Sequence, residues 1–142
     1  MKYDFFIAGR WRNHASIQEV LEAVRAAGKT AYCFIENSYE GEKIELHPDA
    51  SIEASMRAAE ALPVDDPLIR EIFEKDMAAQ KQSAAFLLVF PAGLAAHMEA
   101  GVSYGLGRKC YAVGTPEKTE TLYGIFDQIF PDIEALKTWL AE

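Results

Sequence analysis

The sequence predicts an α/β fold built on a doubly wound, mostly parallel open sheet of about five strands. Two observations predict it. First, apolar runs at 86–90 and 110–113 flank a small-residue segment at 94–106 with helical character, which is the pattern of a strand, a helix and a parallel strand. Second, apolar runs alternate with helical periodicity along the rest of the chain, as in parallel sheets with right-handed crossovers. The expected architecture is Rossmann-like or flavodoxin-like.

The first 35 residues predict a strand, a helix and a second strand. Residues 3–8 are apolar apart from one acid and are expected to form the first strand. Ser16 and Glu19 have the spacing of a capping box, so the helix is expected to begin there and to end at Gly28. Residues 31–35 are expected to form the second strand. The helix should bury one apolar stripe, made of Ile17, Val20, Leu21 and Val24.

The segment 36–66 is strongly acidic. It carries nine acids and two bases, a net charge of −7. We expect one domain over 1–142 with this segment as a variable excursion, containing a loop at 37–41 and an amphipathic helix at 50–62. Because the excursion follows the second strand, it is either a lid near the ligand edge or a solvated surface loop.

The segment 66–82 predicts a helix that carries a candidate functional acid. Asp66 is a typical N-cap and Pro67 suits the first helical position. The apolar stripe, continued by one turn, reaches Asp76. An acid on a buried stripe is paired, protonated or functional, unless the helix turns enough to leave it at the exposed margin. The residues of the stripe are Ile69, Ile72 and Phe73.

Glu99 is the most unusual residue of the central segment. It is the only carboxylate between Asp76 and Glu117, and its neighbours are nearly all apolar or small. Pro91 should end the preceding strand and Gly107 should end the helix, which places Glu99 early in a helix that follows a strand's carboxyl end. Open α/β sheets bind ligands at that edge. The alternative is an ordinary first-turn acid that stabilises the helix dipole.

Two further features of this part of the chain are structural expectations. Gly101 and Gly105 share one helix face, which indicates close approach to the sheet, to a ligand or to another subunit. After a loop, residues 126–130 alternate as a short last strand does, and Asp132 is expected to cap a final amphipathic helix.

Composition excludes several classes of protein. No apolar run approaches the roughly 20 residues of a membrane span, and the N-terminus lacks a signal-peptide pattern. The net charge of −8 without a basic stripe argues against polymeric nucleic acid as a partner. Cys33 and Cys110 are expected to be buried, reduced thiols of a cytoplasmic protein, and no metal site is expected. The strand at 3–8 leads into Gly9, Arg10 and Arg12, a set that suits a small anion or, alternatively, two solvated surface arginines.

The segment FLLVFPAGLAAHMEAGVSYGLGRKCYAV resembles the nucleoside 2-deoxyribosyltransferase superfamily, including its deoxynucleoside 5'-monophosphate N-glycosidase branch. The match consists of an apolar strand, a loop, Glu99-Ala100-Gly101, and Gly107-Arg108-Lys109 before the next strand. The opening FFIAGRWRN is similar to the family's first strand and its following Gly-x-x-Arg loop. The helix EIFEKDMAAQ is similar to the one that supplies the family's second acid, which falls on Asp76.

The resemblance implies an N-glycosidase or deoxyribosyltransferase acting on a nucleoside or a nucleoside 5'-monophosphate, without a cofactor. It implies that Glu99 is the nucleophile and that Asp76 assists protonation of the departing base or orients the nucleophile. Arg12, with Arg10, would bind a 5'-phosphate. His97 would contact a base or phosphate, or would only cap a helix turn. The remaining expected pocket residues are Tyr3, Gly9, Gly93 and Ser103. A homo-oligomer, a dimer or larger, is expected.

Departures from the family pattern leave an alternative open. The loop PAGLAAH lacks the acid with which the transferases hold the base, and Arg10 stands where the glycosidase branch has a serine. The only asparagines are Asn13 and Asn37, so the C-terminal asparagine of the transferases is missing. Hydrolysis and transfer therefore both remain open, and the alternative is a non-catalytic nucleotide-binding or sensor domain. The H-x-E at His97 lacks the Pro-Cys-x-x-Cys of zinc deaminases.

Overall fold

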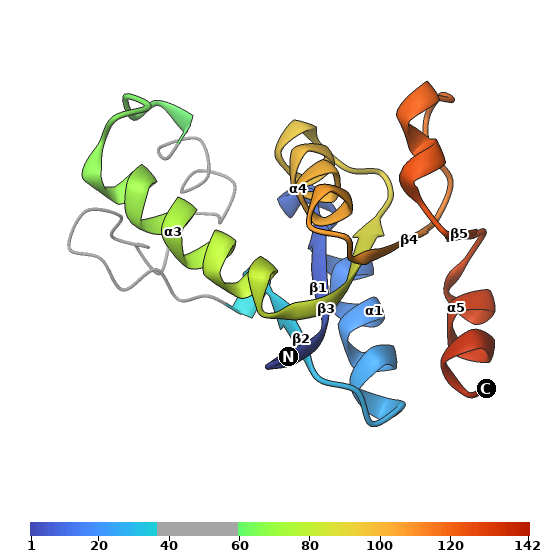
Figure 1. The fold of residues 1–142 in the computed structure, drawn as a ribbon. Helices are drawn as coiled ribbons and strands as arrows, with labels where there is room; N and C mark the ends of the chain where they lie inside the picture. The colour runs from blue at the N-terminus through green and yellow to red at the C-terminus, as the bar shows by residue number, and fades with distance from the viewer. Residues whose placement is uncertain (37–59) are drawn as a thin grey trace.

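The computed structural model describes residues 1–36 and 60–142. In this part of the chain five strands form one parallel sheet in the order β2-β1-β3-β4-β5 (Figure 1). The chain runs from β1 outward to β2 and then crosses to β3 on the other side of β1. The order therefore reverses between β1 and β3, and ligands of such sheets bind at the carboxyl ends of the two strands flanking this point. The strands are Tyr3–Gly9 (β1), Ala31–Cys33 (β2), Ser83–Val89 (β3), Lys109–Val113 (β4) and Gln128–Phe130 (β5).

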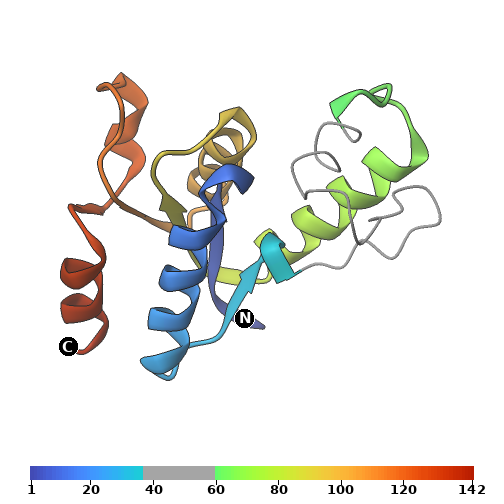
Figure 2. The same ribbon diagram turned by 180° about the vertical axis from the view of Figure 1, so that it is seen from behind.

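Helices cover both faces of the sheet (Figures 1 and 2). The helices α1 (His14–Ala26) and α5 (Ile133–Leu140) pack on one face. The helices α3 (Pro67–Lys81) and α4 (Leu94–Gly105) lie on the other. The doubly wound α/β fold expected from the sequence is confirmed.

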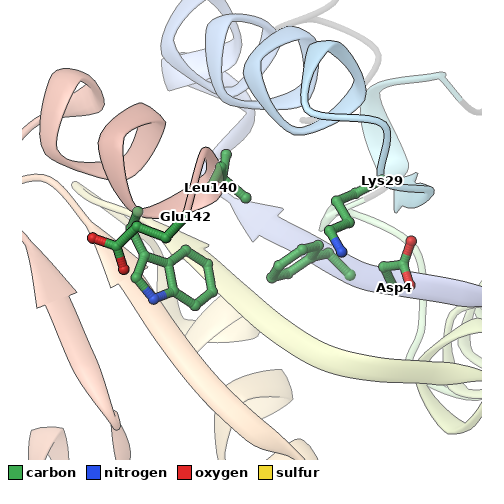
Figure 3. Close-up of a pocket in the computed structure, with 6 residues that line it drawn as sticks. Asp4, Lys29, Leu140 and Glu142 are labelled. Atoms are coloured by element: carbon green, nitrogen blue, oxygen red, sulfur yellow. The ribbon is translucent and has the colours of Figure 1, made fainter.

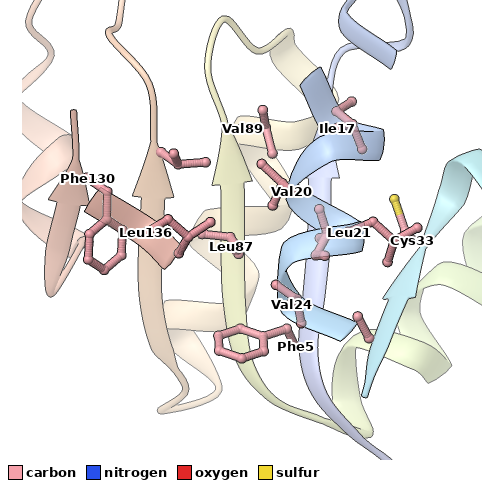
Figure 4. Packing of buried hydrophobic residues seen from close by; sticks show 13 residues of the cluster. Phe5, Ile17, Val20, Leu21, Val24, Cys33, Leu87, Val89, Phe130 and Leu136 are labelled. Atoms are coloured by element: carbon pink, nitrogen blue, oxygen red, sulfur yellow. The ribbon is translucent and has the colours of Figure 1, made fainter. Parts of the chain in front are cut away.

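Each face of the sheet has its own apolar core. Under α1 and α5 the core joins the buried stripe of α1 to the strands, and in Figure 4 these side chains point from the helix toward the sheet. Burying each such side chain stabilises the fold by about 1.5–3 kcal/mol. The expected stripe of α1 is confirmed, and the second core, under α3 and α4, is centred on Phe6, Phe86 and Leu88.

Glycines end two helices as the sequence predicts. Gly28 and Gly107 have φ angles of +79° and +77°, a region that side chains disfavour. At each of these helix ends, an amide just past the glycine reaches back to the last turn, from Lys29 to the Val24 carbonyl at 3.2 Å and from Arg108 to the Ser103 carbonyl at 3.0 Å. Both ends are Schellman motifs.

The aspartate caps are also confirmed. The Asp66 carboxylate accepts from the Leu68 amide at 2.9 Å, and that of Asp132 accepts from the Ala135 amide at 2.8 Å. Each bond satisfies one of the amides that a helix N-terminus leaves without an intrahelical partner.

The expected start of α1 is wrong. The helix begins at His14 rather than at the Ser16 capping box, because the 3₁₀ turn Trp11–Asn13 runs directly into it. Asn13 occupies the N-cap position, but its side-chain amide donates to the Phe90 carbonyl at 3.1 Å. This bond joins the segments that follow β1 and β3.

Other boundaries differ from the sequence prediction as well. β2 ends at Cys33, because Phe34–Glu36 curls into a 3₁₀ turn whose Glu36 pairs with Arg25 at 2.5 Å. β5 covers only Gln128–Phe130, and a 3₁₀ helix at Thr121–Ile125 precedes it. The expected loop at 37–41 and nearly all of the expected helix at 50–62 lie outside the described residues.

The apolar stripe of α3 is partly wrong. Phe73 is 49% exposed, whereas Leu68, which the stripe did not include, is buried. The first half of α3 points away from the sheet in both views, and only its later turns reach the core (Figures 1 and 2). Among the described helices, none is long and apolar enough to cross a membrane.

Candidate active site

Close packing occurs where β1 ends. A Cβ on Gly9 would lie 2.7 Å from the Cδ1 atom of Ile17 and 3.3 Å from the Val89 carbonyl oxygen. Only glycine allows α1 and β3 to approach β1 this closely. Arg10 and Arg12 follow at once and are exposed, so the anion-binding residues expected from the sequence stand at the carboxyl edge of the sheet.

Glu99 lies in the middle of α4. It is the sixth residue of a 12-residue helix, so the reading of Glu99 as a first-turn acid is wrong. The side chain is half-buried, and Asp76 on α3 is an electrostatic neighbour. Burial, and next the negative charge of Asp76, raise the pKa of Glu99 from 4.5 to about 8.

Asp76 lies on α3 and is half-buried rather than at an exposed margin. Its Oδ1 atom accepts a hydrogen bond from the Tyr32 hydroxyl at 3.0 Å, and Tyr32 projects from the middle of β2. Burial raises the pKa of Asp76 above 3.8, whereas the Tyr32 hydrogen bond and the charge of Lys75 oppose that rise. The acid on the apolar stripe is therefore paired, as the chemistry of burial requires.

The two carboxyls form one electrostatic unit. Each is partly desolvated, and the charge of Asp76 disfavours ionisation of Glu99. Asp76 has a hydroxyl donor that favours its charged form, so Glu99 holds a proton up to higher pH than Asp76 does. Such a pair can store a proton and present a carboxylate in one small region, which is the requirement of acid, base and nucleophilic catalysis.

Besides Tyr32, sequence reasoning missed a second residue of this region, Gln80. It lies one helical turn after Asp76 and is 1% exposed. Its Nε2 atom donates to the backbone oxygen of Glu99 and to the Ser103 hydroxyl, the latter at 2.6 Å. Extending the buried stripe of α3 by one further turn beyond Asp76 reaches Gln80, and this was the signal in the sequence that marked it.

His97 and Glu99 are two positions apart on α4, so their side chains project from roughly opposite sides of the helix. The Nδ1 atom of His97 lies 2.7 Å from the Gly93 carbonyl, so this nitrogen carries the proton, and Nε2 accepts from the Tyr123 hydroxyl at 2.9 Å. The imidazole also stacks on the Tyr123 ring and contacts Phe90. A cavity of about 430 Å³ adjoins this group, lined by residues that include Gly93, His97, Lys118 and Tyr123.

The other expected pocket residues are spread through the fold. Ser103 is fully buried against Gln80 between α4 and α3. Tyr3 begins β1, at the opposite end of the strand from Gly9, and its ring packs on Tyr32 at a centroid distance of 5.6 Å. Gly93 is the N-cap of α4, without a side-chain cap. Tyr3 therefore contacts the residue that bonds Asp76.

A separate cavity of about 350 Å³ opens at the amino edge of the sheet (Figure 3). Figure 3 shows Asp4 and Lys29 near the start of β1, with Leu140 and Glu142 at the end of α5. The edge is opposite to the one at which parallel sheets bind ligands, and the cavity contains neither candidate carboxyl. Within 1–36 and 60–142, no group of three or more His, Cys, Asp or Glu side chains is placed to hold a metal ion.

Comparisons with known proteins support the fold. No protein-family model matches the sequence, and no curated protein does. Among solved structures, this chain is similar to a 2-deoxyribosyltransferase from the psychrotolerant bacterium Bacillus psychrosaccharolyticus, with a TM-score of 0.67 and 16% sequence identity. The match covers 94% of this chain and 89% of the other. The fold that the motif resemblance implied is therefore present over nearly the whole chain.

Proposed function

We propose that this chain is a cytoplasmic enzyme that cleaves the N-glycosidic bond of a nucleoside or a nucleoside 5'-monophosphate, with Glu99 as the nucleophile. One observation carries the proposal: Glu99 on α4 and Asp76 on α3 are half-buried carboxyls whose pKa values are both raised. Pairs of perturbed acids are characteristic of catalytic sites. The fold similarity to a 2-deoxyribosyltransferase supports the choice of substrate class.

The proposed reaction has two steps. First, the Glu99 carboxylate attacks the anomeric carbon, the bond from that carbon to the base nitrogen breaks, and its electron pair leaves with the base. The two carboxyls share a proton, and the reactive form is the minor one in which Glu99 is ionised and Asp76 holds that proton. Asp76 gives this proton to the departing base. Water then attacks the anomeric carbon of the glycosyl ester, loses a proton to Asp76 and releases the sugar with the Glu99 carboxylate restored. A second base in place of water gives transfer instead of hydrolysis.

The proposed recognition of a 5'-phosphate on the substrate rests on two arginines. Arg10 and Arg12 are exposed just past the carboxyl end of β1, and guanidinium groups suit phosphate oxygens. If they bind a 5'-phosphate, monophosphates are better substrates than nucleosides, and Arg12→Gln removes that preference. The net charge of −8 makes small nucleotides better candidates than polymers.

The test is a chromatographic screen for free base. The protein is incubated at pH 8 with a panel of nucleosides and 5'-monophosphates, with and without an acceptor base. We expect base release that falls at least about a thousandfold in Glu99→Gln, because the amide is not a nucleophile. Glu71→Gln, an exposed acid on α3, is the matched control and should retain full activity. Turnover that persists in folded Glu99→Gln would overturn the mechanism.

One observation favours the second candidate function, a non-catalytic nucleotide-binding or sensor domain. The segment 91–97, which comprises the loop before α4 and the first turn of that helix, contains no acid, so it offers no carboxylate to hold the base. A binding domain would show ligand-induced increases in melting temperature without release of base from any member of the panel.

A further inference from the structure

Gln80 occupies a distinctive place beside the two carboxyls. On α3 it follows Asp76 by one turn, and on α4 Ser103 follows Glu99 by one turn. The Gln80 side chain bridges the two helices in the layer adjacent to the carboxyls, because its Nε2 atom reaches both Glu99 and Ser103. Gln80 on α3 is thus hydrogen-bonded to the backbone of Glu99, whose side chain is the proposed nucleophile.

Stability alone does not explain a glutamine at this position. The Nε2 atom has two acceptors, but the Oε1 atom is buried without a hydrogen-bond partner among the described residues. A buried acceptor without a partner is unfavourable, and an apolar side chain of similar volume would avoid that cost. An apolar side chain would, however, lack the hydrogen bond to the Glu99 backbone oxygen.

The two carboxyls are held by different groups. Tyr32 bonds the Asp76 carboxylate directly at 3.0 Å. Gln80 bonds the backbone oxygen of Glu99, so it fixes the segment of α4 from which the Glu99 side chain projects. We infer that Gln80 is a positioning residue, which holds Glu99 at a fixed place beside Asp76. The inference concerns catalysis only through the proposed function, but the position of Glu99 can be tested independently.

The first test is kinetic. Gln80→Met keeps the length and volume of the side chain and removes both N–H donors. We expect kcat to fall about a hundredfold while KM changes less than about threefold, because small displacements of a reacting group cost rate rather than binding. The melting temperature should stay the same or rise. Gln18→Met, the same substitution at an exposed site on α1, is the control and should leave activity unchanged.

The second test does not need activity. Carboxyl titration is followed by NMR in protein labelled with ¹³C at glutamate, and the Glu99 signal is assigned by its loss in Glu99→Gln. Release of Glu99 from its place beside Asp76 should move its titration midpoint from about 8 toward 4.5 by at least about half a unit in Gln80→Met. Absence of base release from wild-type protein would refute the proposed function, and the titration would still decide the role of Gln80.

Two results would overturn the inference. One is a Gln80→Met protein whose Glu99 titrates as in the wild type. The other is loss of folding in both Gln80→Met and Gln80→Leu, since that would make the glutamine a stability residue. A lowered midpoint in a folded variant supports the positioning role.

Discussion

At the residue scale, the chemistry of the candidate site depends on the environment of Glu99. The side chain is half-buried and has Asp76 as an electrostatic neighbour, so folding disfavours its charged form. The free energy of unfolding is therefore lower at the pH at which Glu99 is ionised, and the ionised form is the one needed for attack. A substitution that removes the charge should reveal this cost.

Glu99→Gln should stabilise the protein at alkaline pH. The pKa of Glu99 is about 8 in the folded protein and 4.5 in an unfolded chain, so between these values the folded state binds more protons. The free energy of unfolding then falls as pH rises from 4.5 to 8, and it levels off above. We expect Glu99→Gln to be more stable than the wild type by about 1–3 kcal/mol at pH 9 and equal to it at pH 4.

Denaturant unfolding at the two pH values measures this difference. Glu71→Gln, at an exposed position on the neighbouring helix, should change the free energy of unfolding by less than about 0.5 kcal/mol at both. Equal pH dependence in the wild type and Glu99→Gln would contradict the buried, proton-holding state of Glu99.

At the residue scale, the sequence singles out a candidate where an acid stands out against an apolar background. Glu99 and Asp76 could be singled out because a charge on a buried stripe needs an explanation. Gln80 could not be recognised as easily, since a neutral amide does not stand out and its role depends on which helix faces it. The direction of His97 was equally hidden, because it depends on how α4 is rotated against the Thr121–Ile125 helix.

At the element scale, the arrangement depends on the contact between α1 and the end of β1. The Cβ of an alanine at position 9 would lie 2.7 Å from the Ile17 side chain and 3.3 Å from the Val89 carbonyl. Ile17 is fully buried, so it has little room to move. Gly9→Ala should destabilise the protein by about 1–3 kcal/mol through overpacking.

Thermal unfolding provides the measurement for Gly9→Ala. The matched control is Gly124→Ala in the 3₁₀ helix before β5, where an added Cβ meets nothing within 4 Å. The control should change stability by less than about 0.5 kcal/mol. A Gly9→Ala protein as stable as the control would show that α1 tolerates a shift away from β1.

Elements were predictable where one local signal decided them. The Asp66 and Asp132 caps and the Gly28 and Gly107 ends depend on neighbouring backbone alone, and all four are confirmed. The Ser16 capping box was wrong, because the turn at Trp11–Asn13 starts the helix earlier and draws Asn13 toward Phe90. Such a contact joins positions far apart in the chain, which local patterns do not register.

At the scale of the whole molecule, α4 leaves an apolar surface exposed. Leu94, Met98 and Val102 recur every four residues and are 80%, 65% and 38% exposed. Gly101 and Gly105 belong to the same helix, and a Cβ on either would meet nothing within 4 Å. The expectation that these glycines serve close packing against the sheet is therefore wrong, and close approach of a ligand or of another subunit remains.

We expect this surface of α4 to pair with a second copy of the chain, because burial removes apolar area from water at about 25 cal/mol per Å². Light scattering after size exclusion should give at least twice the 15.8 kDa of one chain at micromolar concentration. Replacing Met98 and Val102 with lysine should give a folded monomer, since four charges would face one another across a symmetric contact. Val64→Lys, at a side chain that is 91% exposed outside α4, should leave the mass unchanged. A wild-type mass of one chain would contradict the pairing and would leave a ligand as the remaining expectation for the α4 glycines.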